Sequence, residues 1–528
     1  MQAPYFPIIY VRGYAMTEGE RDETAADPFC GFNLGSTVYR AAIDKKAQPK
    51  RFIFESPVLR LASDFGYSDV YEQGADIMDA DWLPRSGNQG IAPRSIVVYR
   101  YYDSGSTLFS EDAKASPIED YARGLDKLIL RVRDLVCAQE GSALAPADFR
   151  CYLVAHSMGG LVVRAFLQNA ALGSAEARKA VDKVFTYATP HNGIETAGIN
   201  VPAWLGAADM NNFNRKRMAG YLALEAAYAK YDRVDYLPAK ALPIERMFCM
   251  VGSNRADYDV AMGLSRTFAG NGSDGLVKIA NASVWGLDDA GNVTHPAATA
   301  YAYRSHSGTY GIVNSEEAYQ NLTRFLFGDV RVEIWLEIDG VQLPAALEAD
   351  AGDVDALYQF ELLARPRGKR WQLSRRVAEE DSPACRTHKQ LASADAGARM
   401  VYLSTVFLAN RARISSNPDD RTLSYSMDLR VRVPDYEKDR AFWPNQHYEG
   451  SYLFRDSLIV TLEPPLAEGG AWTVKFGWES KEVGVATHKH DYQTLNPARR
   501  VRRATLREGR ALLGAARRGG PSAPGGRG

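Results

Sequence analysis

The chain has 528 residues, 46% of them hydrophobic, with 63 Lys and Arg against 64 Asp and Glu. This length and apolar content predict roughly two or three domains with large packed cores, and they exclude a chain that is disordered throughout. The five cysteines are scattered and odd in number, so they show neither a disulfide framework nor the C-x-x-C spacing of a metal site. They favour a reducing compartment.

The N-terminus and the hydropathy pattern bear on location. The first residues, Met1 to Pro7, hold no basic segment and no signal-peptide apolar core. No apolar run approaches the length of a membrane span. We therefore expect a cytoplasmic protein, unless a specialised system exports it without a signal peptide.

The first 328 residues alternate strands with helices. Apolar or β-branched runs predict strands at 6–11, 95–102, 151–154, 181–188, 246–251 and 299–303. Helical spacing predicts helices at 117–136, directly after residue 157 and at 316–327. This alternation predicts an α/β fold with a doubly wound, mostly parallel sheet, whose ligands bind at the carboxyl ends of the strands.

One serine occupies the corner between a predicted strand and a predicted helix. Ser157 lies in Ala155-His156-Ser157-Met158-Gly159, where G-x-S-x-G is the usual pattern and Ala155 and Gly159 are the small residues that a strained corner requires. The Met158 N–H and the positive end of the helix would point at an oxyanion formed beside the serine. Ser157 is thus the candidate nucleophile, and a buried serine that caps the helix is the alternative.

A nucleophilic serine needs an acid and a base, which in this fold follow it in that order. Asp274 lies in a loop of small residues beyond a predicted strand, and His306 lies just past the last strand. Neutral imidazole removes the serine proton, while the carboxylate fixes the imidazole tautomer and stabilises the imidazolium. Asp257 and Asp259 are the rival acids.

Seven other histidines compete with His306 for the role of base. We expect His156, next to the serine, to turn its side chain away from the site. His191 precedes any plausible acid but could line the substrate pocket, and His295 lies at the wrong end of the sheet. The remaining four fall in the predicted second domain: His388, His447, His488 and His490. His306 therefore remains the candidate base.

Three motifs resemble those of known serine hydrolases. Ala-His-Ser-Met-Gly-Gly at 155–160 resembles the elbow of small bacterial lipases. Ala-Thr-Pro-His-Asn-Gly at 188–193 is similar to a stretch of bacterial lipases and GPI inositol-deacylase-like hydrolases, and Ser-Asp-Gly-Leu-Val at 273–277 is similar to their acid loop. The resemblance covers residues 5–328. It implies the α/β-hydrolase fold of a serine esterase, with the N–H groups of Tyr14 and Met158 as the oxyanion hole.

The turn after the first strand departs from these families. They usually show His-Gly there, whereas this chain has Arg12-Gly13. Arg12 leaves the backbone role of Tyr14 intact. Its guanidinium could bind a substrate phosphate or carboxylate bidentately, or it could pair with a structural acid.

A long insertion at about 196–243 follows the Thr-Pro-His turn and is rich in apolar residues, Trp204 and Leu205 among them. We expect a helical cap over the carboxyl ends of the strands. It is either a lid whose apolar inner face meets an acyl chain or a static cap that completes the core.

After residue 328 the pattern changes to alternating or β-branched runs separated by turns. These predict strands at 330–338, 357–364, 400–408, 423–433, 458–462 and 472–478, and hence an antiparallel β-sandwich-like accessory domain over 329–487. We expect 488–528 to be a disordered tail, strongly basic beyond Asn496. A solvated tail is the simplest interpretation. An anionic membrane surface is the alternative partner for this domain and tail, and no specific nucleic acid is expected.

The sequence therefore predicts a hydrolase that cleaves carboxylic esters, of lipase or phospholipase type, through an acyl-enzyme formed at Ser157 with His306 and Asp274. This chemistry requires no metal and no organic cofactor. An acyltransferase with the same three residues and a soluble short-chain esterase are the alternatives within the enzyme class. A non-catalytic binding protein on the same scaffold is the alternative outside it.

Overall fold

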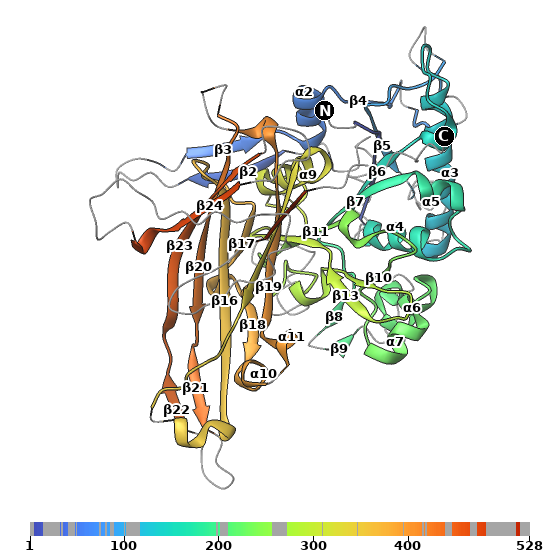
Figure 1. Ribbon diagram of the computed structural model, residues 1–528. Coiled ribbons are helices and arrows are strands. Elements are labelled where there is room, and N and C mark those ends of the chain that lie inside the picture. The colour runs from blue at the N-terminus through green and yellow to red at the C-terminus, as the bar shows by residue number, and fades with distance from the viewer. Residues whose placement is uncertain are drawn as a thin grey trace, which may run out of the picture. The chain divides into compact units, whose positions relative to one another are not determined.

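The computed structural model describes residues 5–13, 32, 35–40, 48, 50–72, 75–79, 82–84, 89–99, 101, 117–196, 199–200, 210–255, 272–308, 310–345, 347–393, 395–413, 417, 420–438, 446–464, 473–481 and 514–517 (Figure 1). Internal contacts divide the chain into two units, Met1–Leu322 and Thr323–Gly528. The division falls inside helix α9 (Glu316–Phe327), whereas the sequence placed it after residue 328. Each unit has its own core.

The N-terminal unit is built on a sheet of seven parallel strands in the order β14-β11-β7-β6-β1-β5-β4. The strands are β1 (Ile8–Val11), β4 (Ser68–Asp69), β5 (Ser95–Tyr99), β6 (Cys151–His156), β7 (Val181–Tyr187), β11 (Met247–Gly252) and β14 (Ala298–Ala302). All but the short β4 are buried almost throughout, as expected where helices cover both faces. The predicted doubly wound α/β sheet is confirmed.

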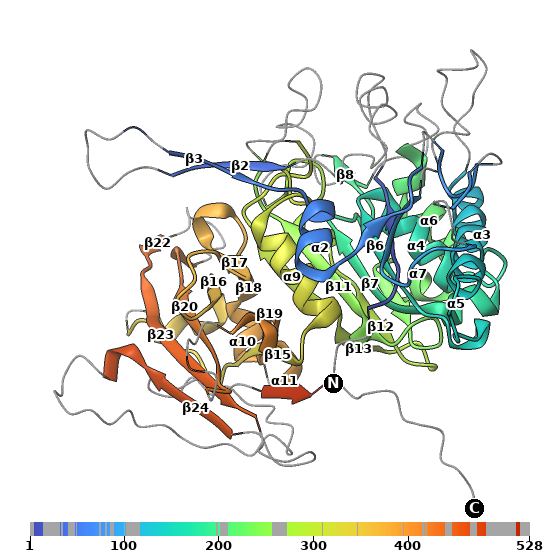
Figure 2. The same ribbon diagram turned by 90° about the horizontal axis from the view of Figure 1, so that it is seen from above.

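Helices pack on both faces of this sheet (Figure 2). One face carries α3 (Ile118–Cys137), α4 (Met158–Gln168) and α5 (Ala175–Ala180), and the other carries α2 (Pro57–Phe65) and α9. Leu125 of α3 and Val162 of α4 are buried in the core on the first face. On the second face Arg60 of α2 pairs with Glu316 of α9 at 2.6 Å.

The described part of the long insertion lies beside α3 and α4. It forms α6 (Arg215–Tyr221), α7 (Glu225–Tyr231) and β10 (Tyr236–Pro238), and β10 joins a small sheet with β12 (Trp285–Leu287) and β13 (Val293–Pro296). Its apolar side chains belong to the core of the unit, namely Phe213, Met218, Leu222 and Leu224. This half of the insertion therefore completes the core. Trp204 and Leu205 lie outside the described residues.

A buried arginine ties the insertion to helix α4. Arg164 donates hydrogen bonds to the carbonyl oxygens of His191 at 2.9 Å, Val234 at 2.6 Å and Tyr236 at 2.8 Å, and to Gln168 Oε1 at 2.9 Å. Burial lowers the pKa of Arg164 to about 10, so the guanidinium stays charged at neutral pH. Since a buried cation needs its donors satisfied, these acceptors hold β10 and the turn after β7 against the helix.

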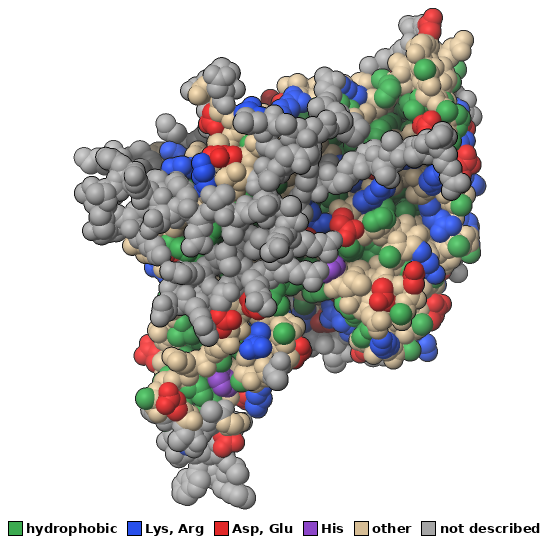
Figure 3. Space-filling model, in the orientation of Figure 1, with side chains coloured by type: hydrophobic (Ala, Val, Ile, Leu, Met, Phe, Trp, Pro, Cys, Tyr) green, Lys and Arg blue, Asp and Glu red, His purple; other side chains and the backbone are tan. Residues whose placement is uncertain are grey.

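Two hairpins complete the strands of the N-terminal unit. They pair β2 (Ser36–Arg40) with β3 (Lys50–Phe54), and β8 (Glu195–Thr196) with β9 (Ile199–Asn200). On the face seen in Figure 3, positive and negative side chains are intermixed over the part of this unit around α6 and α7. Within the described ranges, no helix has both the length and the apolar character needed to cross a bilayer.

The C-terminal unit holds two antiparallel sheets around one core. The first contains β15 (Val330–Glu337), β19 (Met400–Leu408) and β25 (Gly514–Arg517). The second contains β16 (Val354–Pro366), β17 (Ser374–Arg376), β18 (Ala384–Thr387), β20 (Leu423–Arg432), β21 (Asp435–Lys438), β22 (Gln446–Glu449), β23 (Tyr452–Glu463) and β24 (Thr473–Trp478). Ile334 of the first sheet and Leu362 and Leu429 of the second share a core. The predicted sandwich-like domain is confirmed.

Buried and half-buried positions alternate strictly along β15 and β20, which is the pattern of sheets with one buried face. Two short helices, α10 (His388–Ala392) and α11 (Ala396–Arg399), lie between β18 and β19. Within the expected disordered tail, Gly514–Arg517 is a strand that pairs as β25 with residues 330–333 of β15, and the rest of that tail lies outside the described residues. Backbone pairing with an edge strand accounts for this, since Gly and Ala have little strand preference of their own.

Candidate active site

Ser157 stands at the corner between β6 and α4 with φ 52° and ψ −126°. A positive φ is strained for a residue with a side chain, so the surroundings must hold it. The Ser157 N–H donates to the Tyr187 carbonyl at 2.9 Å. A Cβ on Gly159 would lie 2.3 Å from the carbonyl oxygens of Val11 and Arg12. Gly159, two residues after the serine, is thus required because α4 passes directly against the end of β1.

Three polar side chains that are distant in the sequence meet at this corner. Ser157 Oγ lies 2.9 Å from His306 Nε2, and His306 Nδ1 lies 3.0 Å from Asp274 Oδ2. The serine is 5% exposed, the histidine 3% and the aspartate 1%. A carboxylate can only accept at Nδ1, so the neutral ring presents the lone pair of Nε2 to the hydroxyl. The arrangement can remove a proton from Ser157.

Main-chain groups fix the carboxylate. Asp274 Oδ1 accepts from the N–H groups of Leu276 at 3.0 Å and Val277 at 2.8 Å, which leaves Oδ2 for His306. The His306 N–H in turn donates to the Asp274 carbonyl at 3.0 Å. A Cβ on Gly252, the last residue of β11, would lie 2.8 Å from Asp274 Cβ. The rival acids Asp257 and Asp259 lie outside the described residues.

The loop that carries His306 follows β14 and is anchored at both ends. Arg304 pairs with Glu317 of α9 at 3.0 Å. Ser305 accepts from the Ile312 N–H at 2.9 Å, and its hydroxyl donates to the Ser307 carbonyl at 3.0 Å. The base is therefore held by hydrogen bonds on either side of it in the chain.

His156 contacts the base, and the expectation that its side chain turns away from the site is wrong. Its Nε2 lies 2.9 Å from the carbonyl oxygen of His306, and the two rings lie 5.0 Å apart. Burial and the neighbouring His306 lower the pKa of His156 to about 3, so this ring is neutral at working pH. The sequence holds no signal for this contact, because it joins residues that are 150 positions apart.

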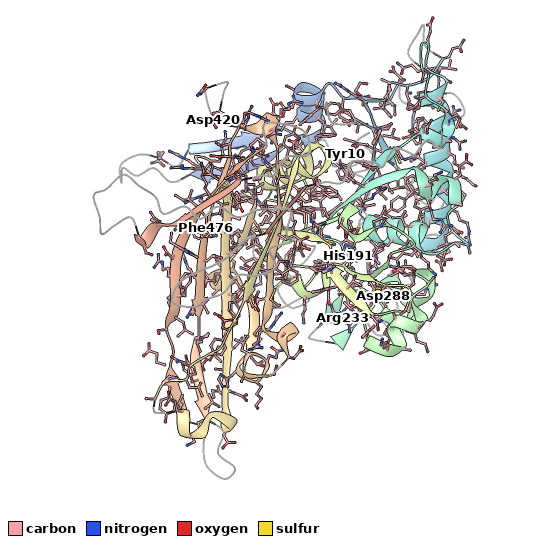
Figure 4. The ribbon with its side chains drawn as sticks, in the orientation of Figure 1. Tyr10, His191, Arg233, Asp288, Asp420 and Phe476 are labelled. Atoms are coloured by element: carbon pink, nitrogen blue, oxygen red, sulfur yellow. The ribbon has the colours of Figure 1, made fainter. Side chains whose placement is uncertain are left out.

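His191 does not line the pocket, which contradicts the prediction. The side chain is 0% exposed, and its Nε2 lies 3.1 Å from Thr186 Oγ1 and 3.7 Å from Cys249 Sγ. Figure 4 labels its position in the N-terminal unit. Burial and the charge of Arg164 keep the pKa of His191 well below its usual range. The Thr-Pro-His turn is thus part of the core.

Of the two predicted oxyanion donors and Arg12, the structure describes Met158 and Arg12. Met158 is the first residue of α4, where N–H groups have no intrahelical acceptor, so its N–H is available beside Ser157. Tyr14 lies outside the described residues, and its N–H remains a prediction. Arg12 is half-buried directly after β1, and its carbonyl accepts from the Tyr101 hydroxyl at 2.7 Å. Among the described side chains, no three His, Cys, Asp or Glu gather as metal ligands would.

Comparisons with known proteins were made by sequence and by structure. No family model matches the sequence, and no curated protein matches it. Solved structures with partial similarity include the mature lipase BlEst2 from Bacillus licheniformis, at 12% identity over 61% of this chain and 93% of that chain, with a TM-score of 0.31. Phospholipase PlaB from Legionella pneumophila matches at 13% identity over 80% of this chain and 86% of that chain, with a TM-score of 0.30.

TM-scores this low do not establish a shared fold, so the assignment depends on the molecule itself. The parallel sheet of seven strands, the strained serine between β6 and α4, and the chain order Ser157, Asp274, His306 are the features that define it. They identify the N-terminal unit as an α/β-hydrolase fold.

Proposed function

We propose that the N-terminal unit is a serine hydrolase that cleaves carboxylic esters of lipids, of lipase or phospholipase type. One observation carries this proposal: Ser157 Oγ lies 2.9 Å from His306 Nε2, whose ring is bonded through Nδ1 to Asp274 at 3.0 Å. The group lies at a strained corner at the carboxyl end of the sheet, which is where α/β-hydrolases present their nucleophile.

The geometry supports a two-step mechanism. Ser157 Oγ attacks the ester carbonyl carbon while His306 Nε2 takes the hydroxyl proton, and the carboxylate of Asp274 stabilises the imidazolium. The Met158 N–H donates to the oxyanion, together with the Tyr14 N–H that the sequence predicts. His306 then returns its proton to the departing alcohol, which leaves an acyl-enzyme. Water then attacks the acyl carbonyl carbon while His306 Nε2 takes its proton, and His306 returns that proton to Ser157 Oγ as the carboxylic acid leaves.

Lipid as the substrate class is supported by the motifs shared with bacterial lipases. Within the proposal, Trp204 and Leu205 belong to an apolar lid over the acyl chain, and Arg12, half-buried next to the serine corner, faces an anionic head group. The C-terminal unit and the arginine-rich tail are proposed to dock on an anionic membrane surface.

A fluorophosphonate probe tests the nucleophile. We expect it to label the intact chain at Ser157, and Ser157→Ala to remove labelling and lower ester hydrolysis by roughly four to six orders of magnitude, as when one member of such a unit is lost. Ser253, a buried serine that follows β11, supplies the matched control, because Ser253→Ala should keep the label. Attachment of the probe to another serine would disprove the proposal.

A chain-length series tests the lipid substrate. Opening an apolar lid exposes hydrophobic surface, which is unfavourable in water and favourable against aggregated lipid. Hydrolysis of a long-chain ester should therefore rise sharply as the substrate forms micelles or vesicles, and anionic vesicles should favour the full chain over one cut before Asn496. Smooth saturation with a preference for the shortest acyl group would leave a soluble esterase.

A further inference from the structure

We propose that His156 is a positioning residue that ties the base to the nucleophile through a main-chain hydrogen bond. The proposal rests on the proposed function for its effect on activity. The contact itself is a structural statement, since His156 Nε2 lies 2.9 Å from the carbonyl oxygen of His306. His156 and Ser157 are neighbours at the end of β6. The residue that holds the base and the nucleophile that the base deprotonates are therefore fixed by the same strand end.

The chemistry of this contact determines which nitrogen of the His156 ring carries the proton. A carbonyl oxygen only accepts, so His156 Nε2 must carry a proton and Nδ1 of the neutral ring must be a lone pair. Burial disfavours the protonated ring, in agreement with the low pKa. A neutral His156 also suits a neighbour that becomes an imidazolium, because a second cation 5.0 Å away would oppose that charge.

The other edge of the His156 ring faces the turn after β1. A Cβ on Gly13 would lie 2.8 Å from His156 Nδ1 and 2.9 Å from Ser157 Cβ. Gly13 precedes Tyr14, the predicted second oxyanion donor. One ring thus separates the oxyanion turn from the loop of the base, and its width sets how far apart they stand.

The role is one of position and not of proton transfer. The hydrogen bond of His156 goes to the main chain of His306, whose ring makes its own bonds to Ser157 and Asp274. Losing the tether should leave substrate binding intact and misplace Nε2 relative to Oγ. Small misplacements of a reacting group lower kcat far more than they change KM.

Two variants separate the hydrogen bond from the volume of the ring. His156→Phe keeps an aromatic ring and removes the donor, whereas His156→Gln keeps an N–H donor at similar reach. We expect His156→Phe to lower kcat on a soluble ester by roughly tenfold to a hundredfold with KM within about threefold, and His156→Gln to restore kcat to within about threefold of the wild type. His388→Phe is the matched control, since it removes a buried histidine with one side-chain hydrogen bond in the other unit.

Hydrogen exchange gives a readout that does not depend on catalysis. The His306 N–H donates to the Asp274 carbonyl of the acid loop, and the Ile312 N–H donates to the Ser305 carbonyl within the loop of the base. They should exchange at least about tenfold faster in His156→Phe and at the wild-type rate in His156→Gln and His388→Phe. If the wild type is not labelled at Ser157, the proposed function fails, while the exchange rates still decide whether the tether exists.

Several outcomes would overturn the proposal. Wild-type kcat and exchange in a folded His156→Phe would do so. Equal losses of activity in the Phe and Gln variants, together with an equal fall in the unfolding temperature, would assign His156 to folding alone. Selective 15N labelling of histidine in the wild-type chain gives a check without a variant: Nε2–H is expected on His156, and Nδ1–H would refute the tether.

Discussion

The two units bury polar side chains in different ways. In the N-terminal unit Ser157, Asp274 and His306 come from three separate loops and form one chain of hydrogen bonds. In the C-terminal unit the buried polar groups form separate small sets of hydrogen bonds. Arg376 donates to the carbonyls of Ser382 and Leu403, Arg375 donates to Glu380, and Tyr358 bonds to His388. Both units therefore bury polar groups. The candidate active site differs from the other buried groups because side chains from three separate loops meet there.

Sheet topology explains this difference. Parallel strands end at the same edge, so the loops after β6, β11 and β14 are brought together there. Antiparallel strands send successive loops to opposite ends, and the polar groups of β16 to β24 are spread along them. Buried polar residues indicate a site only where topology makes their loops meet.

Loss of one buried acid from each unit should give the largest contrast. Asp274→Asn should lower kcat by roughly three to four orders of magnitude, because the amide favours the wrong tautomer of His306. Glu361→Gln replaces an acid whose pKa burial raises in the C-terminal unit, and kcat should stay within about twofold. Initial rates on a soluble ester, with unfolding temperatures for both variants, make the measurement. Similar losses of activity would remove the contrast between the units.

Glycine to alanine changes should give an intermediate effect. Gly13→Ala places a methyl group 2.9 Å from Ser157 Cβ, so we expect kcat to fall by roughly tenfold to a hundredfold. Gly340→Ala, in the C-terminal unit, adds a methyl group where no atom lies within 4 Å, and it should change neither kcat nor the unfolding temperature. If Gly13→Ala keeps full activity, the close approach of the oxyanion turn to the serine corner is not needed for catalysis.

Acid stability should give the smallest effect. The pKa of His156 is about 3 in the folded chain and about 6.5 when unfolded, so between these values only the unfolded chain binds the proton. Stability is therefore complete above pH 6.5 and lost as the pH falls towards 3. His156→Phe should reduce the slope of the unfolding free energy by about 1.4 kcal/mol per pH unit between pH 6 and pH 4.

Chemical denaturation at a series of pH values measures this slope. Burial also lowers the pKa of His388 in the C-terminal unit, so His388→Phe should reduce the slope as well. Parallel curves for the wild type and His156→Phe would show that His156 takes up a proton in the folded chain as readily as in the unfolded one.

Local patterns in the sequence were enough to predict the central features of the fold and of the candidate site. The strand, corner and helix around Ser157 are specified by adjacent residues, and the order of Asp274 and His306 follows from the succession of strands. The contact of His156 with the His306 carbonyl joins residues 150 positions apart, and no local pattern reveals it. His191 was placed wrongly because its motif does not show that Thr186 binds its ring in the core.

Short edge elements were also beyond the sequence. Ser374–Arg376 and Ala384–Thr387 have no alternating apolar pattern, and both become strands by pairing with the long β16. Gly514–Arg517 pairs with β15 in the same way. Their conformation depends on free backbone groups of a partner strand, which composition does not record.

The positions of β1 and His306 in the chain also set the order in which the sheet and the candidate active site can form during synthesis. Strand β1 leaves the ribosome before β5 and β6 but lies between them in the sheet, so it can pair fully only after residue 156 has been made. His306 comes last, on a loop that needs Glu317 for its anchor. A growing chain therefore holds the nucleophile and the acid before it holds the base. Under the proposed function, a nascent polypeptide stays harmless to the lipids around it until the whole N-terminal unit has folded.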